Sequence, residues 1–367
     1  MKSLKGMAKS AMIMLATIVA LGGNVQSSQH KPKDINKVYL TSCIDNQVCS
    51  TESKNVRLEN KVKLNLVAES EENRKKIYFS ESDNIYINGK KIESSEIKRW
   101  DSKNIPIKWF KIEPKNNNYS NGSGEKFHWD KIKYKETLID DGNNWVLNAD
   151  ATPTDSSKNI NDGLGTMRYK FEVINNGKKI SSPGKESTNL YGINDDVHRI
   201  SFRKDNSFVG WLTSFFNLPY IYGSSGKSNK EHQTEKYIGS DCADLIVGAY
   251  RKTGKNIPYT YVAGLTKFTD TIIDEKNLDS DGENYYYNNK SLKFGSDVKV
   301  GDLILFGKWH VGVLVEDKSN PDSEYNGGPD GLFNKYDLMI HTLFNTPTKE
   351  NIGEFGGGSI LRWKNEK

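Results

Sequence analysis

The stretch SDCADLIVGAYRKTG, residues 240–254, carries the clearest helical pattern in the chain. The apolar residues that share one face at the helical period are Leu245, Ile246, Ala249 and Tyr250. Asp241 stands where an N-cap residue is expected, and Gly254 stands where a glycine commonly ends a helix. We therefore expect a half-buried helix that begins at Cys242.

Apolar runs on either side of this helix complete the C-terminal half. Residues 209–216 are typical of a short buried helix ending before Pro219. Four later runs have the length of strands and lie at Leu303–Phe306, His310–Glu316, 336–343 and Ser359–Trp363. A helix followed by an antiparallel run of strands predicts an α+β fold for residues 196–367.

The preceding part, residues 61–190, has the texture of a β-protein. Polar and apolar residues alternate over 62–66 and 167–173, and the pairs Asn88-Gly89 and Asn176-Gly177 are strong tight-turn signals. The similar strings at 87–92 and 175–180 are either an internal repeat or one hairpin chemistry used twice. We expect a mostly-β sandwich or barrel, acting as a possible targeting module, after a polar lead-in over 28–60.

The N-terminus has the features of a signal peptide over residues 1–27. Lys2, Lys5 and Lys9 form a positive region, an apolar stretch covers 11–22, and small and polar residues follow. An uncleaved anchor is the alternative, but the apolar stretch is short for a spanning helix. We expect export to the periplasm, the cell wall or the outside, and no stable membrane span once the signal is removed.

The charge balance argues against nucleic acid as a partner. Removing the three lysines of the signal region from the formal charge of +5 leaves +2. The remaining lysines are scattered among acidic residues and asparagines, whereas nucleic-acid binding usually needs a concentrated basic patch.

The chain has three cysteines, and their spacing separates them into two kinds. Cys43 and Cys49 lie close together and can form a disulfide in an oxidising compartment, the alternative being two free thiols. Cys242 is then left without a partner. In the first turn of a helix, free N–H groups and the helix dipole favour a thiolate, so Cys242 is a candidate nucleophile. The alternative is a buried structural cysteine.

Two histidines are candidates to assist Cys242. His310 opens a predicted strand, and Gly312 beside it leaves room for another backbone or a ligand. His341 lies inside an apolar run and needs a hydrogen-bond partner, which His310 could supply. The alternatives are a surface histidine and a core histidine bonded to backbone. A zinc site built from Cys242, His310 and His341 is a further possibility, although no paired-cysteine spacing supports it.

Four ordered motifs resemble those of the NlpC/P60 cysteine peptidases. They are LPYIYG (218–223), SDCADL (240–245), VGDLILF (300–306) and HVGVLV (310–315). The resemblance covers residues 196–365 and implies a papain-like fold with Cys242, His310 and His341 as the catalytic residues. It also implies that Tyr220 borders the nucleophile and assists the oxyanion site, and that Asp241 lies where the family often grips the amine of the substrate.

The resemblance implies hydrolysis of peptidoglycan stem peptides, without a cofactor and with no metal. This chain departs from the family at Ala243-Asp244, where Ser-Gly is usual. A substrate-binding hydroxyl is lost at the first position and a carboxylate is gained at the second, which puts the exact peptide substrate in doubt. The alternatives are a thiol hydrolase of the same fold acting on a non-wall substrate, as an amidase or effector, and a catalytically inactive wall-binding protein.

Overall fold

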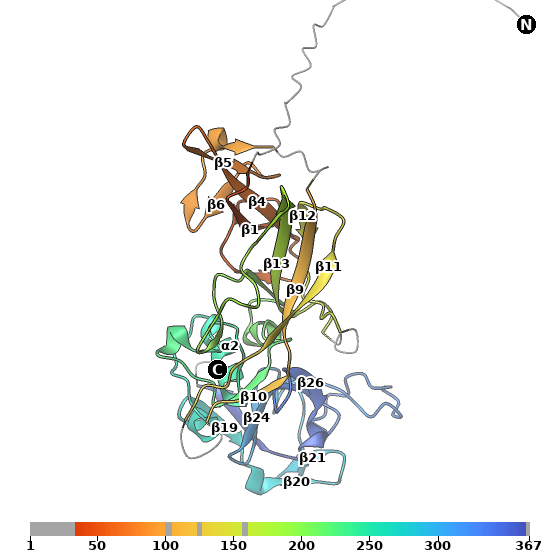
Figure 1. Ribbon diagram of the computed structural model, residues 1–367. Coiled ribbons are helices and arrows are strands. Elements are labelled where there is room, and N and C mark those ends of the chain that lie inside the picture. Colours follow the sequence, from red (N-terminus) through yellow and green to blue (C-terminus); the bar gives the residue numbers. More distant parts are fainter. Residues whose placement is uncertain (1–33, 100–104, 123–126, 156–160, 365–367) are drawn as a thin grey trace, which may run out of the picture.

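The structure is a computed structural model that describes residues 34–99, 105–122, 127–155 and 161–364. The expected signal peptide, residues 1–27, lies outside the described residues. Over the rest of the chain the fold is mostly β, with strands from several sheets stacked along its length (Figure 1). The predicted α+β, papain-like fold is therefore wrong.

Two sheets build the N-terminal half. The first has eight strands: β7 (Lys90–Lys91), β6 (Ile85–Ile87), β2 (Cys49–Ser50), β1 (Lys37–Ile44), β4 (Val62–Glu72), β5 (Lys75–Phe79) and β8 (Ile97–Lys98) in order, with β12 (Val146–Asn148) paired to β4. The second has six: β11 (Tyr134–Asp140), β9 (Ile107–Pro114), β13 (Gly165–Asn175), β17 (Arg199–Arg203) and β3 (Lys54–Arg57) in order, with β14 (Lys178–Ser181) paired to β13. Residues expected as a polar lead-in thus supply β1, β2 and β3.

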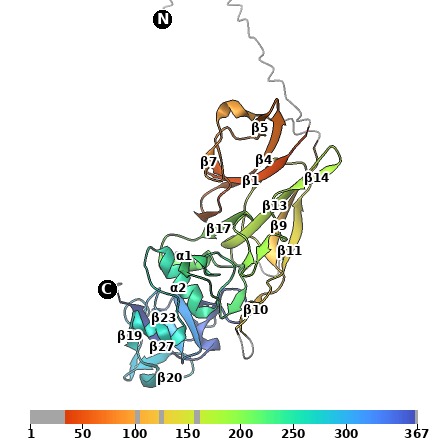
Figure 2. The same cartoon turned by 60° about the vertical axis from the view of Figure 1, so that its left-hand side comes forward.

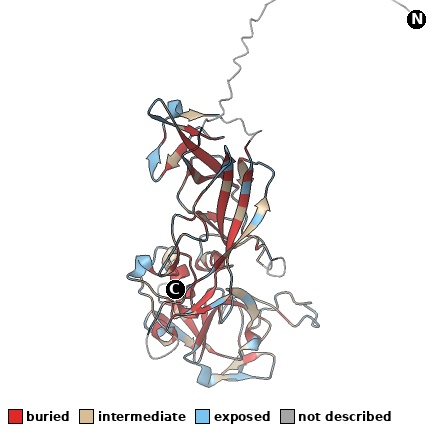
Figure 3. Ribbon diagram, viewed as in Figure 1, coloured by how far each residue is buried: buried red, intermediate tan, exposed pale blue. Residues whose placement is uncertain are grey.

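The two sheets share one apolar core. Leu64 and Leu66 of β4 pack in the same buried cluster as Trp109 of β9 and Phe171 of β13. The red interior of both sheets in Figure 3 shows this burial, while the outer hairpins are exposed. The alternation read from the sequence therefore marks the faces that meet in the core.

The two Asn-Gly pairs form the same turn. Asn88-Gly89 joins β6 to β7 and Asn176-Gly177 joins β13 to β14, and both pairs have φ values of 50° and 76°. Positive φ at both central residues is the requirement of a type I′ hairpin, which Asn and Gly meet with little strain.

The C-terminal half packs two short α-helices on a six-stranded antiparallel sheet. The helices are α1 (Phe208–Thr213) and α2 (Cys242–Lys252). The sheet runs β19 (Thr269–Ile273), β27 (Ser359–Trp363), β23 (Leu303–Phe306), β24 (His310–Glu316), β25 (Leu338–His341) and β26 (Thr348–Asn351). Nine residues of α2 are buried, many of them in a core shared with β24 and β27.

The segments between the main sheets and helices also contain little α-helix, which makes the fold mostly β. Residues between the main elements form short hairpins and 3-10 turns in place of further α-helices. These are β15 (Thr188–Asn189), β16 (Gly192–Ile193), β20 (Leu278–Ser280), β21 (Tyr285–Tyr287), β22 (Lys290–Ser291), η1 (Ser94–Glu96), η4 (Asn229–Glu231), η5 (Val262–Lys267), η6 (Glu275–Asn277) and η7 (Ile352–Glu354). Asn, Asp and Gly favour turns over helix interiors, and they are frequent in these segments.

A parallel strand pair ties the two halves together. β10 (Asn118–Ser120), from the N-terminal half, pairs with β18 (Tyr220–Tyr222), from the C-terminal half. Figure 2 shows β10 below the second sheet and close to α2. The strand that carries Tyr220 is therefore held from the N-terminal half.

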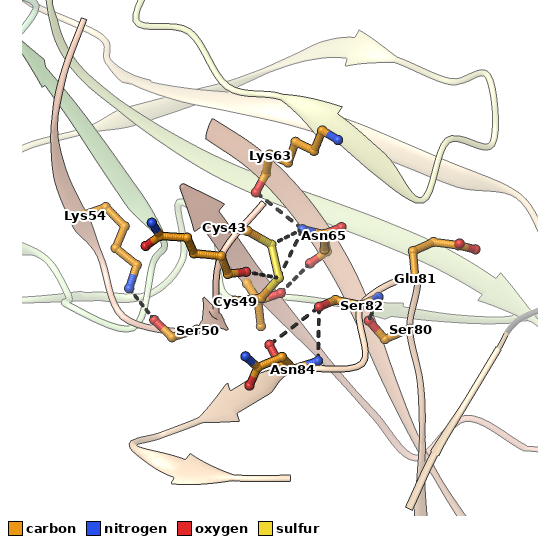
Figure 4. Close-up of a disulfide and its surroundings, with 12 residues drawn as sticks. Cys43, Cys49, Ser50, Lys54, Lys63, Asn65, Ser80, Glu81, Ser82 and Asn84 are labelled. Carbon is orange, nitrogen blue, oxygen red and sulfur yellow. Dashed lines mark hydrogen bonds between the residues drawn. A yellow bond between two sulfur atoms is a disulfide. The ribbon is translucent and has the colours of Figure 1, made fainter. Parts of the chain in front are cut away.

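The predicted disulfide between Cys43 and Cys49 is confirmed. The two cysteines are opposite each other across β1 and β2, and Asn65 donates a hydrogen bond from Nδ2 to Cys43 Sγ at 2.8 Å (Figure 4). Among the described residues, no helix combines the length and apolarity needed to cross a membrane.

Replacing Cys43 and Cys49 together by serine should lower the free energy of unfolding by about 2 kcal/mol, since the unfolded chain regains the freedom that a short closed loop removes. Denaturant titration of the wild type and the double variant would measure this. Ser50→Ala, on the same strand as Cys49, controls for local packing. An unchanged unfolding midpoint in the double variant would contradict a stabilising bridge.

Candidate active site

Cys242 lies at the start of α2, as the sequence predicts. Asp241 is the N-cap, and its side chain accepts a hydrogen bond from Asp244 N at 2.9 Å. Cys242 is the first helical residue and is only 5% exposed. The capped helix start thus fixes the cysteine beneath the surface, facing the core that α2 shares with β24.

His310 begins β24 and is completely buried, with 0% exposure. Aromatic rings surround its imidazole, with ring centroids 5.4 Å away at Trp309, 5.8 Å at Phe306 and 5.0 Å at Phe355. Burial first, and His341 second, lower the pKa of His310 to about 3. The imidazole is therefore neutral at pH 7 and able to accept a proton.

Gly312 allows the neighbouring strand to come close to His310. A Cβ at this position would collide with Met339 Sδ and would lie 3.4 Å from His341 Cβ. The absence of a side chain therefore lets β25 bring His341 against His310. The room beside the histidine that the sequence indicated is filled by this strand.

A hydrogen-bonded row of three side chains crosses the sheet from β24 to β26. His310 Nε2 lies 3.0 Å from His341 Nδ1, and His341 Nε2 lies 3.1 Å from Glu350 Oε2. The Glu350 carboxylate can only accept, so Nε2 of His341 carries the proton and Nδ1 is the acceptor. Nε2 of His310 must then donate, which leaves Nδ1 of His310 unprotonated, with a free lone pair.

His310 is next in the chain to the residue that contacts the cysteine. Within the described part of the chain, His310 Nδ1 is buried and has no hydrogen-bond partner. The backbone N–H of Val311, the residue after His310, points to the Cys242 sulfur and lowers the pKa of the thiol. The strand start and the helix start therefore bring the two sequence-predicted residues together.

The thiolate expected from the helix start is absent in the free protein. Burial, followed by the charge of Asp241, raises the pKa of Cys242 to about 12, against the N–H groups of Val311 and Ala243 that lower it. Desolvation here outweighs the helix dipole, because removing a thiolate from water costs more than a partial charge at the helix end returns. The resting pair is a neutral thiol beside a neutral imidazole.

Tyr220 and Asp241 both border the cysteine. Burial raises the pKa of Tyr220, and the neighbouring Cys242 raises it further. The Tyr220 ring packs against Phe344 at 5.3 Å between centroids, and Phe344 is 61% exposed. Tyr220 and Ser240 are joined by a β-bridge, so the tyrosine lies beside the segment that leads into Asp241 and Cys242.

Asp244 points into the protein. Ser224 Oγ donates to Asp244 Oδ2 at 2.6 Å and accepts from Asp241 N at 3.2 Å, while His232 Nε2 lies 3.6 Å from the same carboxyl. Burial raises the pKa of Asp244 well above its usual range, and Asp241 adds to this. The carboxyl gained relative to the family motif is thus bound internally, where it supports the helix start.

Sequence reasoning missed Glu350. It belongs to β26, which pairs with β25 by placing Thr348 opposite His341 and Glu350 opposite Met339. The segment Thr348–Asn351 is polar throughout, so neither alternation nor apolar character marks it as a strand. A polar hairpin returning after a histidine-bearing strand is the weak signal that could have suggested it.

The zinc alternative finds no support in the geometry. Throughout the described ranges, no group of three or more His, Cys, Asp or Glu side chains is arranged to hold a metal ion. His310 and His341 form a row that ends on Glu350, and Cys242 makes no hydrogen bond to it through His310 Nδ1.

Comparisons with family models, curated proteins and solved structures find no match for this chain.

Cys242 should react with iodoacetamide at pH 7 more slowly than a cysteine of ordinary pKa, because its thiol is buried and neutral. The bridge between Cys43 and Cys49 leaves Cys242 as the remaining thiol, so intact mass spectrometry gives the rate directly. Denaturant should accelerate the reaction. Rapid labelling of the folded protein at pH 7 would show an accessible thiolate and contradict this description.

Proposed function

We propose that this chain is an exported cysteine peptidase or amidase that hydrolyses peptide bonds in the stem peptides of bacterial peptidoglycan, using Cys242, His310 and His341. One observation carries the proposal. A hydrogen-bonded row from Glu350 through His341 leaves a buried, unpartnered Nδ1 on His310, and the next residue, Val311, directs its backbone N–H to the cysteine at the start of α2. A nucleophile, a base and an orienting group in this order are the elements of thiol acyl transfer.

In the acylation step His310 acts as a general base. Its Nδ1 takes the proton of the Cys242 thiol as the sulfur attacks the carbonyl carbon of the scissile amide. The imidazolium that forms is stabilised through His341 by the Glu350 carboxylate. It then gives the proton to the leaving nitrogen as the C–N bond breaks, which leaves a thioester on Cys242.

In the second step water completes the hydrolysis. His310 takes a proton from water, and the resulting hydroxide attacks the thioester carbonyl. The C–S bond breaks, the proton returns to the sulfur, and the carboxylic acid product leaves. The backbone N–H of Cys242 and the hydroxyl of Tyr220 are the groups we assign to the negative oxygen of each tetrahedral intermediate.

The assignment of the substrate rests on the motif resemblance and on Asp241. Asp241 is a half-buried carboxyl beside the nucleophile, where the resembling family grips a substrate amine. Burial raises the pKa of Asp241 to about 6, against N–H groups of Asp244, Ala243 and Gly223. The disulfide between Cys43 and Cys49 supports export, since such bridges persist in oxidising compartments.

Two alternatives use other features of the same site. A thiol hydrolase with a non-wall substrate would need the same row of side chains but no grip on a stem-peptide amine. An inactive wall-binding protein fits the burial of Cys242 and His310. Incubating the mature protein with purified peptidoglycan and defined muropeptides, and identifying products by mass spectrometry, separates all three.

Cys242→Ala and His310→Ala should each lower kcat for stem-peptide hydrolysis by at least about 10³-fold. The thiol and the imidazole act together in one proton transfer, and each substitution removes one of the two partners. The double variant should be no slower than either single variant. His341→Asn keeps a hydrogen-bond partner for His310 and should retain more activity than His341→Leu. Glu350→Gln should lose less than His341→Leu, because it keeps an acceptor while removing the charge.

Chelation serves as the control for this series. Wild-type activity should survive EDTA, and all variants should show the wild-type circular dichroism spectrum. Near-normal turnover in His310→Ala, or loss of wild-type turnover on chelation, would rule out the proposed pair.

With a substrate that bears a free amine, kcat/KM should fall as the pH drops below about 6, because Asp241 becomes protonated and loses its attraction for the ammonium. His310, with a pKa of about 3, stays neutral across this range and cannot cause the fall. Asp241→Asn should have a low kcat/KM that no longer changes between pH 5 and 7. An unaltered pH profile in Asp241→Asn would remove Asp241 from substrate binding.

A further inference from the structure

A cavity of about 260 Å³ lies between the two halves of the chain, and its lining includes Pro219, the residue before Tyr220. One wall comes from β9, β11 and the segment before β10, and the other comes from the segment before β18 and from β26. A hydrogen bond from Asn117 Nδ2 to Asn345 Oδ1, 3.0 Å long, bridges the two walls. Figure 1 shows β9, β10 and β26 converging in this region.

The lining of this interhalf pocket is polar but almost without net charge. Amides and hydroxyls dominate it, and they come from Asn116, Asn117, Asn217, Asn345, Thr346 and Thr348. Its two charged side chains, Glu113 and Lys135, are 3.5 Å apart and offset each other. Prolines on both walls add small apolar surfaces. This composition suits a neutral ligand rich in hydroxyl and amide groups, and it offers no strong attraction to an ion.

Several of these polar groups are available to a ligand. Among the described residues, the side-chain amide of Asn116, Nδ2 of Asn345 and the hydroxyl of Thr346 make no hydrogen bond within the protein. Asn217 is different, because its Nδ2 donates to Ala151 O at 2.7 Å and holds the wall in place. The pocket therefore combines a fixed frame with donors and acceptors that face its interior.

Residues that line the interhalf pocket are neighbours, in the chain or across the sheet, of residues that border the candidate site. Pro219 lines the pocket and precedes Tyr220, while Asn345 lines it and follows Phe344. The Tyr220 and Phe344 rings are in contact, and Thr348 pairs in register with His341. A polymer with one part in the pocket would thus pass close to Tyr220 and Phe344, at the edge of the candidate site.

We infer that the interhalf pocket binds an N-acetylated sugar unit of the glycan strand while the attached stem peptide enters the Cys242 site. Sugar rings present hydroxyls and an acetamido group for amides and hydroxyls to bind, and apolar C–H faces for prolines and aromatic rings. The volume lies just below the range of about 300–1,000 Å³ that is usual for small-molecule pockets, which suits one small unit of a longer chain. The inference rests on the proposed function, since it names the polymer to which the cleaved peptide is joined.

The test is calorimetric titration of full-length mature Cys242→Ala protein with a soluble tetramer of N-acetylglucosamine. Binding should be measurable at micromolar to millimolar concentration. Thr346→Trp, which fills the pocket, should weaken it at least tenfold, and Asn116→Ala should weaken it about threefold or more. The matched control is Asn229→Trp, an exposed position on η4 away from the pocket, which should bind like the parent. Circular dichroism and thermal melting of each variant separate a lost site from a lost fold.

A second measurement separates this inference from the proposed function. In protein that keeps the native Cys242, the Thr346→Trp variant should hydrolyse free stem peptides at the wild-type rate. The same variant should release products from intact peptidoglycan at least fivefold more slowly than the wild type. Hydrolysis of free peptides without any binding of the sugar tetramer overturns the sugar site and leaves the proposed function standing. Sugar binding that depends on Thr346 with no hydrolysis of any peptide overturns the proposed function and leaves a carbohydrate site. Thr346-dependent binding of free stem peptide, and not of sugar, overturns the inference in favour of a peptide subsite.

Discussion

The hydrogen bond between His310 and His341 is the constraint on which the candidate site depends. Two imidazoles can meet at 3.0 Å only if their strands are neighbours, and Gly312 makes that approach possible. The direction of this hydrogen bond is set by the contact at the other side of His341, because the Glu350 carboxylate can only accept a hydrogen bond from His341 Nε2. The carboxylate of Glu350 on β26 thereby determines which nitrogen of His310, two strands away on β24, is unprotonated.

Burial gives this arrangement its chemical character. The same desolvation that keeps His310 a neutral imidazole keeps Cys242 a neutral thiol, so in the mechanism we propose proton transfer and attack on the substrate belong to one step. A preformed ion pair would be costly in this apolar surrounding. In that mechanism the reactive state is created only when a substrate carbonyl is present, and the neutral thiol reacts slowly with other electrophiles.

Local signals in the sequence predicted the elements well. The strands Leu303–Phe306, His310–Glu316 and Ser359–Trp363 agree with β23, β24 and β27, since each is a short apolar run with clear ends. Both Asn-Gly turns, the Asp241 cap and the disulfide were predictable for the same reason, because neighbouring residues determine them. The fold class could not be predicted in this way. It depends on the structure of the long segments between the main elements, such as β20–β22, and the sequences of these segments do not specify helix or strand.

The residues of the candidate site also differ in how far the sequence alone could identify them. Cys242, His310 and His341 stand out as individual residues, whereas Glu350 acquires its role only from the register of β25 against β26. Tyr220 shows a longer-range dependence. Its strand, β18, pairs on one side with β10 from the N-terminal half and is bridged on the other to Ser240, just before the nucleophile. The N-terminal half therefore contributes to the geometry of the candidate site, because β10 supplies backbone hydrogen bonds on which the position of Tyr220 relative to Cys242 depends.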